Sequence, residues 1–96
     1  MPKIHVRYES SLAELANCDS EEFDLPDGAT LDDFKMMMIE RHGTAVTGAD
    51  REYQWRHSTS YVLYCVDGLV RSEEEMKEIK AVEGMKVRVI PPLAGG

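Results

Sequence analysis

The chain has little of what several large protein classes require. Among its 96 residues there are only two cysteines, Cys18 and Cys65, too few and too far apart for the disulfide framework of a small secreted domain. No apolar run approaches the ~20 residues that cross a bilayer, and residues 1–5 do not begin a signal peptide. We therefore expect a small cytoplasmic protein that has no membrane partner.

Basic residues are also scarce. Eleven Lys and Arg stand against eighteen Asp and Glu, which gives a formal net charge of −7. Nucleic acids and anionic membranes attract proteins with a surplus of positive charge, so neither is an expected partner. Half of the acids lie in residues 9–33, which contain no Lys or Arg. This segment is interpreted as a solvated face, or alternatively as a surface that steers a basic partner.

Motifs for catalysis or metal binding are missing as well. His5, His42 and His57 have no neighbours at metal-ligand spacing, and the chain has no Gly-rich phosphate loop or Ser–His–acid set. Cys65 lies in an apolar run, typical of a small buried hydrophobic residue, whereas the acids around Cys18 should raise the pKa of its thiol. We therefore predict that the protein is not an enzyme and binds no metal or cofactor.

What the sequence does contain is a set of short alternating segments. Residues 3–8 and 85–89 alternate between apolar and charged side chains, as strands with one buried face do. Residues 21–25 alternate in the same way over a shorter span, and residues 10–17 before them predict a short helix. The first two strands would then form a broad hairpin.

The clearest helix begins after Thr30, which is a good N-cap with Asp33 at the position for a reciprocal bond. Gly43 is expected to end this helix. An apolar stripe at helical spacing is expected to face the core: Leu31, Phe34, Met37 and Met38. The polar residues 43–60 show no sustained period and are predicted to be a loop with a short helical or strand piece, in which Trp55 anchors the loop or meets a partner.

A second hairpin follows. Residues 61–66 form a continuous apolar run, which predicts a strand buried on both faces. The dipeptide Asp67-Gly68 is a hairpin turn signal before a short return strand at residues 69–71. Ser72, with Glu75 three residues later, predicts a capped helix of about two turns over residues 73–79.

The order of elements predicts an α+β fold. A mixed sheet of four to five strands would wrap over one main helix, with the first and last strands parallel and side by side in the middle. This is the β-grasp arrangement of ubiquitin. We assign residues 1–90 to this domain and residues 91–96 to an extended, flexible and functional C-terminal tail.

The tail is the most informative segment, and it reads Pro91-Pro92-Leu93-Ala94-Gly95-Gly96. Its two prolines cannot donate to a sheet ladder, so they stop the last strand and keep the chain extended. Its two glycines carry no side chain, so another surface can approach their backbone closely. Such a tail is well shaped for threading a narrow channel in a partner.

This tail resembles that of the ubiquitin-like sulfur carriers, above all the small subunit of molybdopterin synthase and next the thiamine-pathway carrier. Two weaker motifs support the resemblance: Val66-Asp67-Gly68 and Glu83-Gly84-Met85-Lys86-Val87. Asp67 stands where the family usually has Asn, and Met85 where it has a second acid in the turn. The spacing from the proline pair to the diglycine is the most specific feature.

The resemblance implies a carrier protein, or the small non-catalytic subunit of a synthase. An E1-like activating enzyme would use ATP to adenylate the Gly96 carboxylate. A persulfide donor would then convert it to a thiocarboxylate, which an acceptor synthase subunit would use for cofactor biosynthesis, with molybdopterin as the expected product. Gly95 would give clearance for the reaction. Contacts with these partners would fall on Pro91, Pro92, Leu93 and Ala94.

Two other functions are left open by the same residues. The protein could be a ubiquitin-like modifier that is joined through Gly96 to lysines of target proteins, which also begins with adenylation. Alternatively, it could be a non-catalytic β-grasp interaction module in which the glycines have no role.

Overall fold

The computed structural model describes the backbone of residues 1–45 and 49–91, in which five strands form one mixed sheet. In the sheet order β2-β1-β5-β3-β4, the strands are β2 (Ser20–Asp24), β1 (Lys3–Tyr8), β5 (Lys86–Ile90), β3 (Leu63–Val66) and β4 (Leu69–Arg71). The helices are α1 (Ser11–Ala16), α2 (Leu31–Ala45), α3 (Ala49–Thr59) and α4 (Glu73–Met76). No helix in this described part is long and apolar enough to cross a membrane.

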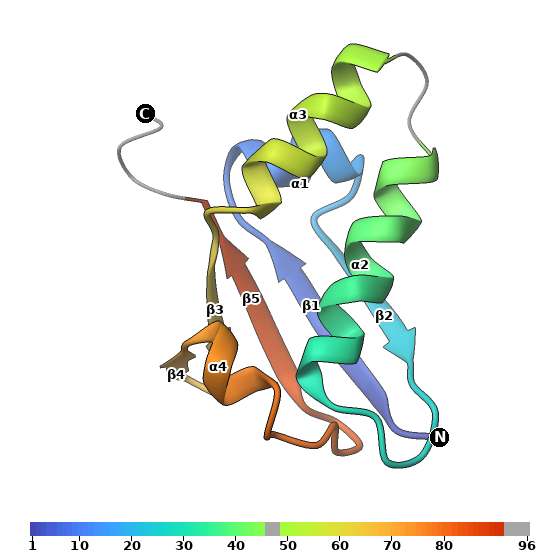
Figure 1. Ribbon diagram of the computed structural model, residues 1–96, viewed down its shortest axis with the longest axis vertical. Coiled ribbons are helices and arrows are strands. Elements are labelled where there is room, and N and C mark those ends of the chain that lie inside the picture. Colours follow the sequence, from blue (N-terminus) through green and yellow to red (C-terminus); the bar gives the residue numbers. More distant parts are fainter. Residues whose placement is uncertain (46–48, 92–96) are drawn as a thin grey trace.

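The centre of the sheet is the predicted parallel pair of β1 and β5, with Val6 opposite Val87 and Tyr8 opposite Val89. β2 pairs antiparallel with β1 as the other arm of the broad hairpin, and β3 pairs antiparallel with β5. Figure 1 shows α2 and α3 covering one face of this sheet. The predicted β-grasp fold is confirmed.

The core lies between the sheet and α2. Thr30 and Asp33 start the helix as predicted: the Thr30 N–H donates to the Asp33 carboxylate (2.8 Å), and the Asp33 N–H donates to the Thr30 hydroxyl (3.3 Å). Met37 is only partly buried. The other three residues of the predicted stripe are fully buried with the sheet's inward side chains, and the facing sets are Leu31, Phe34 and Met38 from α2 and Ile4, Val6, Val87 and Val89 from the sheet.

The prediction for residues 43–60 was wrong over most of its length. α2 continues through Gly43 to Ala45, and Ala49–Thr59 form a full helix, α3, in place of a loop; residues 46–48 lie outside the described residues. A Cβ on Gly43 would lie 2.7 Å from the Arg56 guanidinium. Gly43 therefore leaves room for the Arg56 side chain of α3, and it does not end the helix.

Trp55 explains why a polar segment becomes a helix. Its side chain is fully buried, and its indole N–H donates to the Ile39 carbonyl on α2 over 3.0 Å. Thr59, also buried, donates its hydroxyl to the Trp55 carbonyl (2.8 Å). Few side chains of α3 are buried, so its sequence shows only a weak apolar period. The helical conformation of this segment therefore depends on tertiary packing. Trp55 therefore anchors this segment to α2, which was one of the two interpretations of this residue in the sequence.

Two further elements differ from prediction in extent. β3 begins at Leu63, which is 51% exposed, and its other three residues are buried: Tyr64, Cys65 and Val66. Because Cys65 alternates with Tyr64 and lies on the opposite face, the predicted burial on both faces holds for residues 64–66 and fails at Leu63. α4 has its predicted capping box between Ser72 and Glu75 but is one turn long. Ile79 packs against the core from beyond the helix.

Replacing Trp55 by Ala should lower the free energy of unfolding by about 3–5 kcal/mol, because a large cavity would open between α3 and the sheet. Urea unfolding followed by far-ultraviolet circular dichroism measures the change. The control is Tyr53→Ala on the same helix, where the side chain is 67% exposed and the expected change is within about 0.5 kcal/mol. Equal losses in the two variants would contradict this account of α3.

Candidate functional site

The tail leaves the domain from the best-restrained strand. β5 lies between β1 and β3, and its last residue, Ile90, pairs with Leu63. Beside it the Glu9 N–H donates to the Val89 carbonyl (3.1 Å), and the Glu9 carboxylate accepts from Arg88 at 2.8–2.9 Å. Pro91 follows Ile90 and is half-buried. The remaining predicted site residues lie outside the described part of the chain: Pro92, Leu93, Ala94, Gly95 and Gly96.

The sheet face that the helices leave uncovered carries a basic band. His5 lies opposite Lys86 and Arg7 opposite Arg88 in the β1–β5 register, and strand alternation turns all four side chains away from the helices. We call this surface the open face. A hollow of about 360 Å³ lies there, and Cys65 lines it together with these four residues. Cys65 is buried, as predicted.

Exposed apolar side chains lie next to this band. Val70 pairs with Cys65 across the β3–β4 hairpin and is 60% exposed, and Leu63, opposite Ile90, is 51% exposed. Leu63 is thus beside the point where the tail leaves the sheet. Apolar residues gathered beside charged ones mark a surface suited to protein–protein contact.

The acidic residues of 9–33 do not form a free acidic face. Glu22 pairs with His5 at 3.0 Å, Glu9 pairs with Arg88, and Glu21 pairs with Arg41 at 3.0 Å. Much of the segment's negative charge therefore contacts bases that come from other elements. The sequence pattern alone did not indicate these ion pairs, because the bases are distant along the chain from the acids that they contact.

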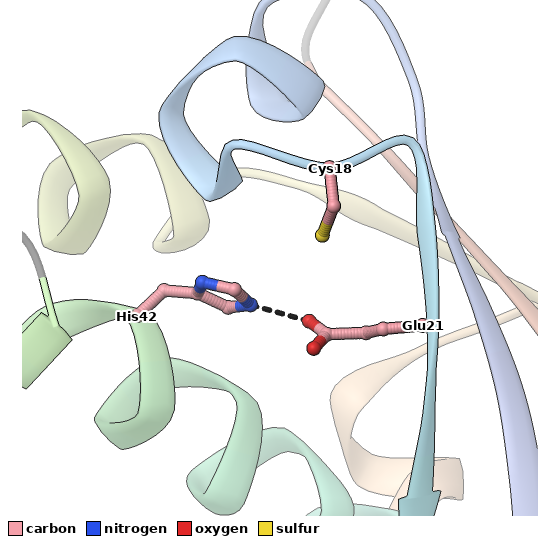
Figure 2. Close-up of side chains that lie close together, drawn as sticks. All are labelled: Cys18, Glu21 and His42. Carbon is pink, nitrogen blue, oxygen red and sulfur yellow. Dashed lines mark hydrogen bonds and ion pairs between the residues drawn. The ribbon is translucent and has the colours of Figure 1, made fainter.

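A second group of functional side chains lies on the helix side of the sheet. Glu21 on β2, His42 on α2 and Cys18 after α1 point toward one another (Figure 2), and one ligand-type atom of each lies within 4.8 Å of the others. The Glu21 carboxylate forms hydrogen bonds with His42 Nε2 and the Tyr8 hydroxyl, and it accepts a bond from Arg41 Nη1.

These contacts shift the titration of the group. Burial by itself would raise the pKa of Glu21, but the hydrogen bonds from Tyr8, His42 and Arg41 outweigh it and hold the pKa below its usual range. The pKa of Cys18 is raised, first by burial and then by the charges of Glu21 and Asp19. The predicted direction for Cys18 is therefore confirmed, with burial as the larger cause.

Sequence reasoning missed this convergence. It judged the three histidines by motif spacing, whereas Cys18, Glu21 and His42 come from three separate elements. The one local indication of this group in the sequence was the short interval between Cys18 and Glu21. The other two histidines lie elsewhere: His5 is on the open face, and His57 stacks on another side chain of α3.

No protein-family model matches the sequence, and no curated protein is significantly similar to it. Solved structures do match. A protein described as molybdopterin converting factor subunit 1 from Pyrococcus furiosus is 25% identical with a TM-score of 0.66, covering 97% of this chain and 100% of its own. Two crystal structures of small archaeal modifier protein 1 from Haloferax volcanii have TM-scores of 0.69 at 20% and 18% identity, covering 98% and 97% of this chain and 99% and 100% of theirs.

These matches and the sheet order define the fold: the chain has the ubiquitin-like β-grasp fold. It matches a molybdopterin converting factor subunit and an archaeal modifier protein over nearly its whole length. The resemblance seen in the sequence is therefore supported by structure.

Replacing Glu21 by Gln should lower the free energy of unfolding at pH 7 by on the order of 1–3 kcal/mol, because an amide loses the charge-assisted bonds to His42 and Arg41. A lowered folded-state pKa means that this stabilisation is present above the unfolded value of about 4.3. It is lost as the pH falls through the lower folded value. The deficit should therefore shrink between about pH 5 and pH 3.

Urea unfolding at a series of pH values measures this deficit. The control is Glu78→Gln, an exposed acid after α4, which should change stability little at any pH. A deficit for the Glu21 variant that stays constant down to about pH 3 would show that the ionised carboxylate is not the stabilising species.

Proposed function

We propose that the protein is a sulfur carrier that works through Gly96. Its carboxylate would attack ATP on an E1-like activating enzyme and form an acyl adenylate with release of pyrophosphate. The terminal sulfur of a persulfide would then displace AMP, and a thiol would cleave the resulting acyl disulfide to leave a thiocarboxylate. An acceptor synthase subunit would use that sulfur, with molybdopterin as the proposed product.

One observation carries the proposal: the Pro-Pro-Leu-Ala-Gly-Gly segment directly follows the central strand of a β-grasp domain. A carrier needs a rigid body that a partner can recognise and a narrow extension that reaches a separate active site. The register on both sides of β5 supplies the rigid origin. Residues 91–96, when extended, span on the order of 20 Å, which is enough to enter a partner's cleft.

The partners would bind on the open face. This surface joins a basic band to the exposed apolar residues Leu63 and Val70, and Leu63 lies beside the tail's origin. A partner that offers acidic groups around an apolar patch would complement it. Arg7 and Arg88 already share Glu9, and His5 pairs with Glu22, so Lys86 is the base of the band without an ion pair among the described residues. The proposal therefore expects an acidic group of the activating enzyme opposite Lys86, in contrast to the basic partner that the acidic segment had indicated.

A second function is favoured by a specific finding. Two of the matched structures are those of a small archaeal modifier protein, with TM-scores of 0.69. As a modifier, this chain would use the same adenylated Gly96 but would transfer it to a lysine amine. An amide bond to a target protein would then take the place of the thiocarboxylate.

Intact-mass measurement distinguishes these functions. The protein is incubated with ATP, an E1-like activating enzyme from the same source and a persulfide donor, and a carrier gains the mass that replaces one oxygen by sulfur. A variant that lacks Gly95 and Gly96 should show no gain, whereas Glu78→Gln, a change at an exposed acid after α4, should still react. Protein-sized adducts on lysines would favour the modifier, and no change with a competent enzyme pair would contradict both.

Reversing charge on the open face should slow docking. Lys86→Glu should reduce the association rate with the activating enzyme roughly tenfold at low salt, because steering by complementary charge is lost. The difference should shrink at high ionic strength. The matched control is Lys77→Glu on the exposed end of α4, which makes the same charge change elsewhere. Equal slowing in stopped-flow measurements of both variants would contradict docking on this face.

A further inference from the structure

Three side chains that commonly bind metals converge on the helix side of the sheet. The Cys18 thiol, a Glu21 carboxylate oxygen and a His42 ring nitrogen all lie within 4.8 Å of one another, and Figure 2 shows the thiol directed toward the gap between the other two. In a tetrahedral zinc site, with ligand distances of about 2.0–2.3 Å, such atoms are about 3.3–3.7 Å apart. We propose that Cys18, Glu21 and His42 form a zinc-binding site.

The backbone holds Cys18 in place for this role. Asn17 adopts a left-handed conformation (φ 60°, ψ 30°) at the end of α1, which turns the chain back toward β2. The Cys18 N–H then donates to the Ala13 carbonyl at 3.1 Å. Asparagine tolerates this conformation better than most residues. The thiol is therefore presented by a defined helix end.

The other two ligands come from rigid elements. Glu21 lies on β2 in register with Val6 on the central strand β1. His42 lies in the last part of α2, and its ring packs edge-on against the rings of Tyr8 and Trp55, with centroids 5.5 Å and 5.0 Å away. Closing around an ion therefore requires movements of side chains on a fixed frame.

Two neighbouring side chains orient one of the proposed ligands. The Tyr8 hydroxyl and the Arg41 guanidinium both donate to Glu21, which orients its carboxylate. Outer partners of this kind fix ligand geometry and support metal affinity. A bound ion would replace the hydrogen bond between Glu21 and His42 with bonds from both groups to the metal.

The donor set selects the kind of ion. One thiolate, one imidazole and one carboxylate suit Zn²⁺, whereas Mg²⁺ and Ca²⁺ prefer oxygen alone. The charges of a Cys18 thiolate, a Glu21 carboxylate and Zn²⁺ sum to zero, so these three charges would leave no excess charge in the partly buried site. His42 and Glu21 side chains are 10% and 18% exposed, which leaves access for a water molecule as a fourth ligand.

The bound ion would tie α1, β2 and α2 together at one end of the sheet. Tyr8, which contacts this group, lies opposite Val89 on β5, so the same end of the sheet leads into the tail. A zinc ion that binds the folded chain alone would raise the unfolding temperature, by an amount that grows with the logarithm of the free zinc concentration divided by the Kd.

The test uses the full chain, freed of metal and kept reduced, with Zn²⁺ and Co²⁺ as probes. Calorimetric titration should show one bound Zn²⁺ per chain, and the Co²⁺ complex should show a thiolate-to-cobalt absorption band. Cys18→Ser should abolish that band and weaken Zn²⁺ binding by at least tenfold, and His42→Asn should weaken it similarly. The matched controls, Cys65→Ala and His57→Asn, should bind as the unaltered chain does.

Either of two outcomes would overturn the proposal: no saturable Zn²⁺ binding, or binding that is unchanged in the Cys18→Ser variant. Far-ultraviolet circular dichroism checks that each variant is folded. If His42→Asn is unfolded because its ring packs against Trp55, the Cys18 variant decides the question. Cys18 is only partly buried at a helix end, so its conservative replacement leaves the packing intact.

Discussion

The rest of the structure depends on the parallel pairing of β1 with β5. These strands are far apart in the sequence, and their register places Val6 beside Val87 in the core. The same register aligns the basic side chains that form the open face. Because the other strands add to this pair on either side, β5 is held by two neighbours up to Val89, and Ile90 pairs with Leu63 of β3. A rigid origin for the tail follows from the pairing that builds the core.

The helix α3 shows how a segment with a weak apolar period can still pack against the core. α3 is mostly polar, yet Trp55 places a large ring against Tyr8 and His42 and bonds to the backbone of α2. Gly43 leaves space for the Arg56 guanidinium at the crossing of the two helices. The ring that secures α3 therefore also shapes the surroundings of His42, so packing and the proposed zinc site are physically linked.

The two proposed activities use opposite faces of one sheet. The open face, with its basic band and Leu63 beside the tail, suits docking of enzymes that act on Gly96. The group of Cys18, Glu21 and His42 lies on the helix side. Sulfur transfer needs no catalytic group from the carrier, since the activating enzyme and the acceptor supply the chemistry. In the proposed function, the domain would contribute recognition by partners and the presentation of a narrow tail.

The sequence by itself determined the elements whose signals are local. Strand alternation, the Thr30 and Ser72 caps and the Asp67-Gly68 turn each depend on residues within a few positions of one another, so they indicated the β-grasp order and the parallel centre. Only the tertiary structure decided that residues 49–59 are helical, that Leu63 at the start of β3 is exposed, and that Cys18 meets His42. Those outcomes depend on contacts between segments distant in sequence, and such contacts leave no period or spacing in the chain.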